Sequence, residues 1–598
     1  MDTVQEQLRP AAVFDRILLK NLAALLKPYK LRFFITLFLL VFSELLITAF
    51  PKILQFAIDG PITNKNYSGL IHLCLLLLVI MILAFVCLCI KTWLNQWIGQ
   101  HAIFDLRLKL INHVQKFSMS FFHKTPVGTL IARFTSDIDL LSDILSELFV
   151  TVLSSILKLA LIIFFLITIS VKLLAISLAI VPFITILAWW FKKKNRAAFT
   201  RIRGLTAQIV SFVQENINGM HVVQLFGREN KNMDDFEKLN KRFRDEYLKT
   251  VQTFSIYFPA MNLINTSSIC LILFLGTKMY IQGQITVGAL PAFMIYLGMF
   301  VEPIRQIADR YSNMQHAMAA AERVFSLLKN KKTEPDNGDR YLSKMPHTID
   351  FNSVSFGYNK NEPVLTDISL TVRSGERIAS VGSTGSGKTT IINLLSRFYD
   401  PWSGTIMLNG IPAGNYALHS LRSSINTVSQ DLFVFNASVA ENISMGCPEL
   451  SREKIEFVCR QIHINNFILN LPRGYDTILG DEGAKLSTGQ KQLIAFARVL
   501  AFDPPVLVLD EATSHIDSET EHLILNAMDT LMKGRTTIAI AHRLSTLRKV
   551  ERIYVLHKGR IREHGTHAEL IRKHGIYAKL YELQFRQNQY ITDIMGKI

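Results

Sequence analysis

Charged residues are scarce in this chain of 598 residues. Asp, Glu, Lys and Arg make up 19% of the sequence, hydrophobic residues make up 49%, and the mean hydropathy is +0.25. The apolar residues gather in the first half of the chain, in runs of about 18 or more that are long enough to cross a bilayer. This composition excludes a purely soluble enzyme.

Cysteine is also sparse and shows no pattern. The chain has six cysteines, and Cys74, Cys87, Cys89 and Cys270 lie inside apolar runs, where a thiol behaves as a small hydrophobe. No spacing among the six is typical of metal ligands or of a disulfide framework. The cysteines therefore predict neither a zinc site nor a disulfide-stabilised fold.

The first 30 residues lack the features of a cleavable signal peptide. Asp15 and Lys20 interrupt the apolar residues, so this segment has no clean apolar core and no small-residue cleavage site. We expect residues 1–30 to form an amphipathic elbow instead. In it a helix over Val13–Leu26 would lie on the membrane surface before Pro28 turns the chain inward.

Basic residues outnumber acidic ones, 65 to 48, which gives a formal net charge of +17. Many of them flank apolar segments, as in the run Lys192–Arg196 that follows Trp189 and Trp190. This placement is typical of membrane-interface anchors. We therefore expect the lipid bilayer, and no nucleic acid, as a partner.

The apolar runs predict a transmembrane domain over residues 31–328. An even number of spans leaves both chain ends on one side of the membrane. The two long connections, 95–148 and 192–252, carry 5 and 13 basic residues, against Lys65, Lys172 and Lys278 near the other connections, so both termini should be cytoplasmic and the protein a multi-pass cell (inner) membrane protein. The six expected spans are Phe33–Leu54, Leu70–Leu94, Phe149–Ile169, Leu173–Phe191, Phe258–Tyr280 and Val287–Arg305.

The second half of the chain has a different pattern. Residues 329–347 are polar and include Pro335 and Gly338, which is typical of a linker. Strand-like and helical segments then alternate over 348–583, before a tail at 584–598. The sequence predicts an all-α six-helix membrane domain followed by an α/β domain.

A glycine-rich loop lies near the start of the α/β domain, between an expected strand, Arg377–Val381, and an expected helix, Thr390–Arg397. Its pattern is that of a phosphate-binding loop, in which glycines let backbone N–H groups surround phosphate, the lysine reaches the β and γ phosphates and a hydroxyl binds Mg²⁺. The candidate nucleotide-binding residues here are Gly382, Ser383, Thr384, Gly385, Ser386, Gly387, Lys388, Thr389 and Thr390.

A second candidate element is the buried strand Val506–Leu509, which runs into Asp510 and Glu511. A carboxylate at such a strand end can hold Mg²⁺ through water, and its neighbour can polarise the attacking water. These roles would fall to Asp510 and Glu511. Acidic pairs at strand ends are common, so this pair alone is weak evidence for a nucleotide site. The phosphate-binding loop upstream makes the evidence strong.

The order and spacing of these motifs resemble an ATP-binding cassette (ABC) transporter, and residues 348–583 resemble its nucleotide-binding domain. With the preceding spans, the chain is similar to type I exporter half-transporters, most of all the bacterial multidrug-resistance-like ones, apart from about its first ten and last fifteen residues. The further matching positions are Tyr358, which stacks on adenine in the family, the Q-loop residue Gln430, the signature Leu486–Gln490, the D-loop Ser514–Asp517 and the switch residue His542.

The resemblance implies ATP and Mg²⁺ as cofactors and a dimer in which the signature of one chain closes on ATP held by the other. It implies catalytic roles for Glu511, His542 and Lys388. Nucleotide contacts would come from Tyr358, Gln430, Asp510 and the signature residues Ser487, Thr488, Gly489 and Gln490. The implied Mg²⁺ ligands are Thr389, Gln430 and Asp510.

One signature position departs from the family, which commonly has glycine where this chain has Thr488. A β-branched residue beside phosphate restricts the backbone and fills space that glycine leaves empty. The ATP site that uses this signature should be slow. We therefore expect a heterodimer with a second half-transporter chain that carries the glycine; the alternative is a homodimer that tolerates threonine.

The membrane domain offers further candidates. The segments Arg133–Leu145 and Glu215–Phe226 lie at the tips of the long connections and resemble coupling helices. Charge at membrane depth is costly, so Glu44 and Lys158 need a partner or a wet cavity, and either could line a substrate path. Glu302 and Arg305, three residues apart, are expected to pair with each other.

Together these features predict ATP-driven export of an amphipathic drug-like or lipid-like substrate. An ATP-gated channel would use the same motifs to control a pore, and an exporter of peptides or lipid precursors would keep the mechanism and change the cargo. An importer is less compatible with fused domains and long inner helices, which resemble exporters.

Overall fold

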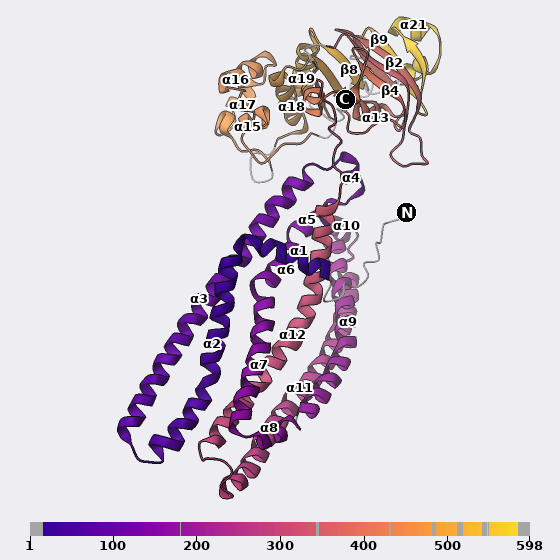
Figure 1. Ribbon diagram of the computed structural model, residues 1–598. Helices are drawn as coiled ribbons and strands as arrows, with labels where there is room; N and C mark the ends of the chain where they lie inside the picture. The colour runs from indigo at the N-terminus through magenta and orange to yellow at the C-terminus, as the bar shows by residue number, and fades with distance from the viewer. Residues whose placement is uncertain are drawn as a thin grey trace. The chain divides into compact units, whose positions relative to one another are not determined.

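The computed structural model describes residues 16–179, 181–342, 346–429, 432–480, 486–510, 518–540, 547 and 549–583. The described chain divides into two compact units (Figure 1). One is helical and takes in the chain up to Gln115 and from Val127 to Asn330. The other combines Lys116–Pro126 with the chain from Lys331 onward. Glu511, His542, Gln430 and the D-loop Ser514–Asp517 lie outside the described residues.

The helical unit consists mainly of a few long helices. Its helices are α1 (Arg16–Leu26), α2 (Lys30–Ala57), α3 (Tyr67–Val114), α5 (Val127–Phe134), α6 (Ser136–Asp143), α7 (Phe149–Ile169), α8 (Val171–Leu178), α9 (Val181–Asn218), α10 (Met220–Leu225), α11 (Glu229–Ile281) and α12 (Ala289–Lys329).

Four helical stretches within the described residues are long and apolar enough to cross a membrane: Arg16–Ile62, Tyr67–Val114, Val127–Ile169 and Glu229–Ile281. They contain four of the six expected spans. The fourth expected span is divided between α8 and α9. The sixth lies on α12, where Glu302 and Arg305 follow its apolar part. The spans and domain bounds stay predictions.

The first helix, α1, lies within the segment expected to form the elbow, which stays a prediction. Leu18 and Leu22 of α1 are buried, and their spacing of four puts them on one face of the helix. The helix packs against α3 and α12. Pro28 then lies in a short 3₁₀ turn that leads into α2.

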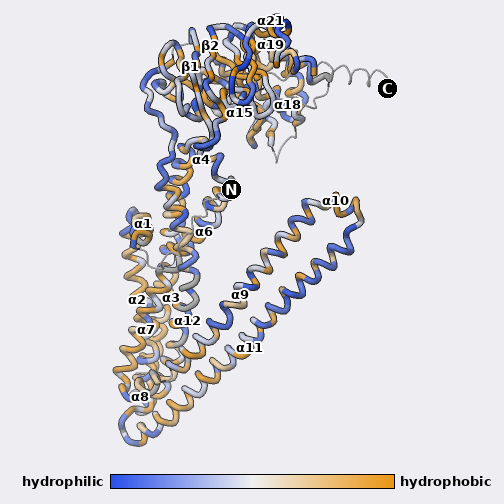
Figure 2. Tube along the Cα trace, turned by 90° about the vertical axis from the view of Figure 1, so that its right-hand side faces the viewer, coloured by the Kyte–Doolittle hydropathy of each residue, from blue (hydrophilic) through white to orange (hydrophobic). Residues whose placement is uncertain are grey.

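Helices α9 and α11 pair along their length and diverge from the bundle of α2, α3, α7 and α12 (Figure 2). The short helix α10 joins them at the tip, inside the expected segment Glu215–Phe226. Apolar side chains are exposed there: Leu225 is 67% exposed and Phe226 is 75% exposed. Exposed apolar groups at a helix tip indicate a surface that another protein segment covers.

The second unit contains the α/β fold. Its strands are β1 (Thr348–Phe356), β2 (Leu365–Arg373), β3 (Arg377–Gly382), β4 (Ser403–Leu408), β5 (Ile411–Pro412), β6 (Ile425–Val428), β7 (Val506–Asp510), β8 (Thr536–Ile540), β9 (Arg552–His557) and β10 (Arg560–Gly565).

The helices of this unit are mostly short. They are α4 (Met119–Lys124), α13 (Lys388–Leu395), α14 (Leu418–Ser424), α15 (Val439–Ser444), α16 (Arg452–Gln461), α17 (Asn465–Leu469), α18 (Thr488–Phe502), α19 (Ser518–Met532) and α21 (His567–Arg572).

Two sheets organise the unit. Four antiparallel strands run in the order β2-β1-β4-β5, and six strands run in the order β10-β9-β3-β8-β7-β6. Within the second sheet, β9, β3, β8, β7 and β6 are parallel to one another, and β10 pairs antiparallel with β9. Every residue of β8 and the first four of β7 are buried, which is the usual pattern of a parallel sheet covered on both faces.

The expected linker is held against the α/β unit. Both terminal nitrogens of Arg422 donate to the Glu334 carboxylate, at 2.8 and 2.9 Å. Further along, the Asp336 carboxylate accepts from the backbone N–H of Leu418 at 2.9 Å. The polar residues that predicted a linker therefore serve as anchors, and this part of the segment is no free spacer.

The short segment Lys116–Pro126 belongs to this unit and contains α4. The backbone N–H of Ser118 donates to Lys332 O, and the backbone N–H of Glu334 donates to Lys116 O, both at 3.0 Å. The tip of the first long connection is thus α4. The expected segment Arg133–Leu145 covers the end of α5, α6 and the following turn in the helical unit, so its assignment to the tip is wrong. The prediction placed the tip too late in the chain, because the helical unit resumes at Val127, where α5 begins.

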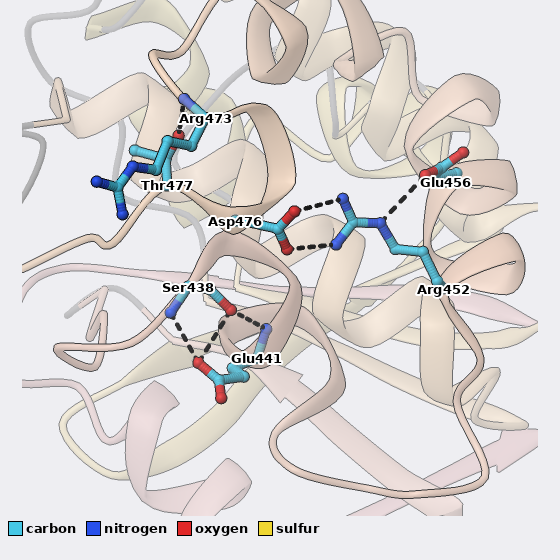
Figure 3. A network of polar contacts seen from close by, with 7 residues as sticks. All are labelled: Ser438, Glu441, Arg452, Glu456, Arg473, Asp476 and Thr477. Atoms are coloured by element: carbon cyan, nitrogen blue, oxygen red, sulfur yellow. Dashed lines mark hydrogen bonds and ion pairs between the residues drawn. The ribbon is translucent and has the colours of Figure 1, made fainter.

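A helical subdomain, α15 to α17, is held by polar contacts (Figure 3). Arg452 donates to Asp476 at 2.9 Å and to Glu456 at 3.1 Å, and its guanidinium lies over the Tyr475 ring. Ser438 and Glu441 cap α15 reciprocally. These contacts fix the ends of short helices that would be marginal alone.

Candidate functional site

The sheet order brings the candidate residues to one edge. β3, β8, β7 and β6 are parallel, so their carboxyl ends lie on the same side of the sheet. The phosphate-binding loop follows β3 and Asp510 ends β7. β8 lies between them and pairs Ile540 with both Ser380 and Asp510. Ligands bind at such carboxyl edges in open α/β sheets.

Two other candidates follow strands that end at this edge. β6 ends at Val428, two residues before Gln430, and β8 ends at Ile540, two residues before His542. Glu511 directly follows Asp510 in the chain. The three side chains lie outside the described residues, so their roles stay predictions.

Glycine is required at two places in the loop. Gly387 has φ +100°, and a Cβ there would come within 2.5 Å of the Leu365 side chain. A Cβ on Gly382 would lie 2.3 Å from the Leu556 carbonyl oxygen. Gly387 directly precedes α13, so the loop opens onto the N-terminus of a helix, where anions are favoured. A side chain at either glycine would displace the backbone that cradles phosphate.

The polar groups of the loop fit a phosphate ligand. The hydroxyl of Ser386 is buried and has no hydrogen-bond partner among the described residues, a costly state that a phosphate oxygen would relieve. Ser383, Thr384 and Thr389 are exposed and can reach a ligand. Thr389 is the hydroxyl that could hold Mg²⁺, which Asp510 would also face.

Lys388 is buried and turned back on its own loop. Its ammonium donates to the carbonyls of Gly382 at 2.8 Å and Ser383 at 3.0 Å. Burial lowers the pKa of Lys388, and the nearby charge of Asp510 opposes that shift. A desolvated ammonium held between loop and carboxylate is available to a phosphate oxygen, which is a stronger partner than a carbonyl.

The candidate adenine-stacking residue lies beside the loop. The Tyr358 hydroxyl lies 3.3 Å from the Thr390 hydroxyl and accepts from the Asn393 amide at 3.0 Å. Thr390 is buried, so in this arrangement its hydroxyl faces Tyr358 and not the open side of the loop. The Tyr358 ring also packs edge-on against Tyr399, with centroids 5.2 Å apart.

Tyr399 links this aromatic cluster to α4, a contact that the sequence did not reveal. The His123 ring of α4 stacks on Tyr399 with an interplanar angle of 9°, and its Nδ1 is hydrogen-bonded to the Tyr399 hydroxyl. A histidine near the tip of a long helical connection was the available signal, but nothing in its spacing pointed to Tyr399.

The signature begins α18. The Ser487 hydroxyl accepts from the Gln490 backbone N–H at 3.2 Å, and the Gln490 side chain accepts from the Ser487 backbone N–H at 3.0 Å. The helix starts at Thr488, because this reciprocal cap stabilises its first turn. Ser487 and Thr488 are exposed and Gly489 is buried.

Two family profiles match the chain. The profile of the ABC transporter transmembrane region matches residues 33–304, and the profile described as ABC transporter matches residues 365–514. An "ATP-dependent lipid A-core flippase" of Syntrophus aciditrophicus is 34% identical over 574 residues, covering 95% of both chains.

The chain belongs to the ABC transporter family. A "putative multidrug export ATP-binding/permease protein" of Bacillus subtilis is 32% identical over 574 residues, covering 95% of this chain and 99% of the relative. The structure of a bacterial Atm1-family ABC exporter with ATP bound matches with a TM-score of 0.74 and 26% identity. It covers 93% of this chain and 98% of that one.

These matches confirm the predicted fold class, a type I ABC exporter in which a helical membrane domain precedes an α/β nucleotide-binding domain. The chain is a half-transporter of this family. Its ATP hydrolysis drives export across a membrane, and its nucleotide-binding domain binds ATP.

Proposed function

We propose that this ABC half-transporter exports an amphipathic drug-like or lipid-like substrate by closing two nucleotide-binding units around ATP. The observation that carries the proposal is the shared carboxyl edge of β3, β8 and β7, which sets Lys388 and its loop beside Asp510. The names of the two relatives, lipid flippase and multidrug exporter, support an amphipathic cargo.

In this proposal each residue at the carboxyl edge of the sheet has its own role in ATP binding or hydrolysis. The loop N–H groups and Lys388 hold the phosphates, and Tyr358 stacks on adenine. Glu511 takes a proton from the attacking water and His542 contacts the γ-phosphate. Mg²⁺, when bound by Thr389, Asp510 and Gln430, supplies charge neutralisation at the phosphate oxygens.

Two chains are needed, because the signature and the phosphate-binding loop lie on different parts of one chain and must meet on one ATP. The α9–α11 hairpin supports a second chain, since its tip exposes Leu225 and Phe226. We favour a heterodimer because Thr488 occupies the family's glycine position. A homodimer is the alternative outcome.

The apolar helices support a multi-pass location in the cell (inner) membrane. The excess of basic residues in 95–148 and 192–252 supports cytoplasmic termini. On this topology the nucleotide-binding unit lies in the cytoplasm, where ATP is available.

The test is transport by the full-length chain, with and without a co-expressed partner half-transporter, in sealed vesicles. An exporter moves amphipathic cargo against its gradient only with ATP outside the inverted vesicles. Passive conductance without coupled flux would establish the channel alternative instead.

Glu511→Gln provides the matched chemical control. We expect it to retain ATP binding and to lose hydrolysis by about 10²-fold or more, because a positioned general base contributes at least that much. Unchanged turnover in Glu511→Gln would show that another group polarises the water.

A further inference from the structure

Basic residues gather where α9 leaves its apolar run. The run Val181–Phe191 is followed by six basic residues within the twelve positions 192–203, which form the basic segment of α9. No aspartate or glutamate occurs in the sequence from Val181 to Gln214. Figure 2 shows the change along α9, which is hydrophobic near α8 and hydrophilic farther along. The basic segment therefore carries charge of one sign.

The packing of α9 determines which side chains of this segment face outward. Asn195, Ala198 and Ile202 are buried, and their spacing of three and four puts them on one face of the helix. Lys193 lies two residues before Asn195, which is about 200° around the helix. Lys193 and Lys194 are both exposed. The lysines therefore lie on the surface of the helical unit and not inside it.

Two tryptophans hold these lysine side chains at the end of the apolar run. Lys193 Nζ lies 5.1 Å from the centroid of the Trp189 ring, and Lys194 Nζ lies 5.2 Å from that of Trp190. Both lysines thus reach back by one helical turn toward the expected span, and tryptophan is enriched at this level of a membrane. An aromatic ring has no net charge, so each ammonium keeps its charge for a further partner.

The neighbouring helix α11 reaches the same level with aromatic residues. The Phe191 ring lies 4.0 Å from the Tyr257 ring and 5.0 Å from the Phe254 ring, measured between centroids. Aromatic residues on both helices are typical of a membrane boundary. On the proposed topology, this boundary is the cytoplasmic one, and the basic segment begins at the level of the lipid headgroups.

The nearest carboxylate of α11 along the chain already has basic partners. Glu246 is the last acidic residue of α11, since none occurs from Tyr247 to Ile281. Its carboxylate accepts from Arg201 Nε at 2.9 Å and from Lys249 Nζ at 2.6 Å. Neither helix therefore offers a carboxylate at the level of the two lysines that lie over tryptophan.

We propose that the basic segment of α9 binds the headgroups of anionic phospholipids in the cytoplasmic leaflet. Lys193 and Lys194 donate to the lipid phosphate from their positions over the tryptophan rings, and Arg196 adds a third charge. A lipid with net negative charge is favoured, because the cationic group of a zwitterionic headgroup is repelled by the same segment. The inference rests on the proposed membrane topology and is independent of the cargo and of the ATP cycle.

The test uses the tryptophans beside the lysines as reporters. In the full-length chain, Trp93→Phe with Trp97→Phe leaves Trp189 and Trp190 as the only tryptophans before residue 402. This variant is reconstituted into mixed vesicles of phosphatidylcholine and phosphatidylglycerol, and one lipid at a time carries brominated chains, which quench nearby tryptophan fluorescence. We expect phosphatidylglycerol to bind beside the two tryptophans at least about threefold more tightly than phosphatidylcholine.

The two lipids also separate this inference from the topology on which it rests. Equal quenching by the two brominated lipids would overturn the anionic preference and leave α9 in the membrane. Absence of quenching by either lipid would show that Trp189 and Trp190 lie outside the bilayer, and the proposed topology would fail together with the inference.

Lys193→Gln with Lys194→Gln removes two charges and keeps both tryptophans. We expect the preference for phosphatidylglycerol to fall below about twofold, because two of the ammonium groups that attract it are lost. Lys231→Gln with Lys573→Gln removes the same charge from exposed sites. Because Lys231 lies about 35 Å from Phe254 along α11, this control should keep the preference. An unchanged preference in the double variant of α9 would overturn the proposal.

If that double variant does not fold, Arg196→Gln, at another exposed position, should lower the preference in the same direction. Salts separate a lipid headgroup from a free anion. Sodium chloride and sodium phosphate at equal ionic strength should weaken the preference equally, because both screen the charges. A loss of the preference in phosphate alone would show that the basic segment takes free anions, and the lipid assignment would then be rejected.

Discussion

At the scale of single residues, the proposed nucleotide site contains the buried ammonium of Lys388, whose loss of hydration is partly offset by its own loop. Lys388 donates to the carbonyls of Gly382 and Ser383, and its release from them costs little when a phosphate replaces both. The side-chain hydroxyl of Ser386 has no hydrogen-bond partner among the described residues. The loop is therefore preorganised for an anion, with donors that have no better internal acceptor.

Replacing Lys388 with alanine should weaken ATP binding about tenfold or more, because a charge-assisted hydrogen bond to phosphate is lost. The binding of a fluorescent ATP analogue measures this. Lys573→Ala, an exposed lysine of the same unit, serves as the control and should bind normally. Equal affinity in Lys388→Ala would contradict the assigned role.

The lowered pKa of Lys388 also predicts a pH dependence. The lysine is charged below its folded pKa, so its attraction for phosphate is present at neutral pH and is lost as pH rises through that value. Burial lowers this pKa from 10.5, so affinity should fall earlier on the alkaline side than an ordinary lysine would predict. Titration from about pH 7 to about pH 10 should show the fall in wild type and not in Lys388→Gln.

At the scale of elements, the first turn of α18 combines a structural cap with a predicted ATP contact. The same reciprocal cap occurs at α21, where Thr566 and Glu569 replace Ser487 and Gln490. The two caps are chemically alike, but α21 carries none of the predicted nucleotide ligands. Comparing the α18 cap with the α21 cap therefore distinguishes the effect of a lost cap from the effect of a lost ATP contact.

We expect Ser487→Ala and Thr566→Ala each to lower the free energy of unfolding by about 1 kcal/mol, the usual cost of a lost cap. ATP turnover should fall only in Ser487→Ala. Chemical denaturation and a phosphate-release assay measure the two effects. Equal turnover in both variants would leave Ser487 with a capping role alone.

The α10 tip is the second element that makes a prediction. Phe226→Glu should reduce ATP turnover and transport several-fold, because a charge replaces an apolar contact with a second chain, while ATP binding stays normal. Val210→Glu, on α9 and also exposed, is the control. If the two variants behave alike, the tip is not an interface.

At the scale of the whole molecule, Thr488 bears on the composition of the dimer. Purified without a partner, the chain should turn over ATP slowly, and Thr488→Gly should raise the rate by removing the β-branched side chain beside phosphate. Size-exclusion chromatography with a phosphate-release assay measures both. A stable homodimer with vigorous turnover would contradict the heterodimer hypothesis.

The sequence alone determined the family, the fold class and the local chemistry of the loop. These could be predicted because a phosphate-binding loop is built from consecutive residues, and because a long run of apolar residues is itself the feature that favours a membrane interior. The strand Arg377–Val381 and the strand ending at Asp510 were predicted within one residue for the same reason. The resemblance added Tyr358 and the signature, whose roles no local pattern explains.

Tertiary structure alone decided which distant residues meet. The strand order sets Lys388 near Asp510, and the packing of α4 brings His123 to Tyr399. Residues of α3, α7 and α12, among them Lys91, line one cavity of the helical unit. Which side chains meet across long sequence separations depends on how helices and strands pack. The sequence pattern shows which face of each element is apolar, but not which other element packs against that face.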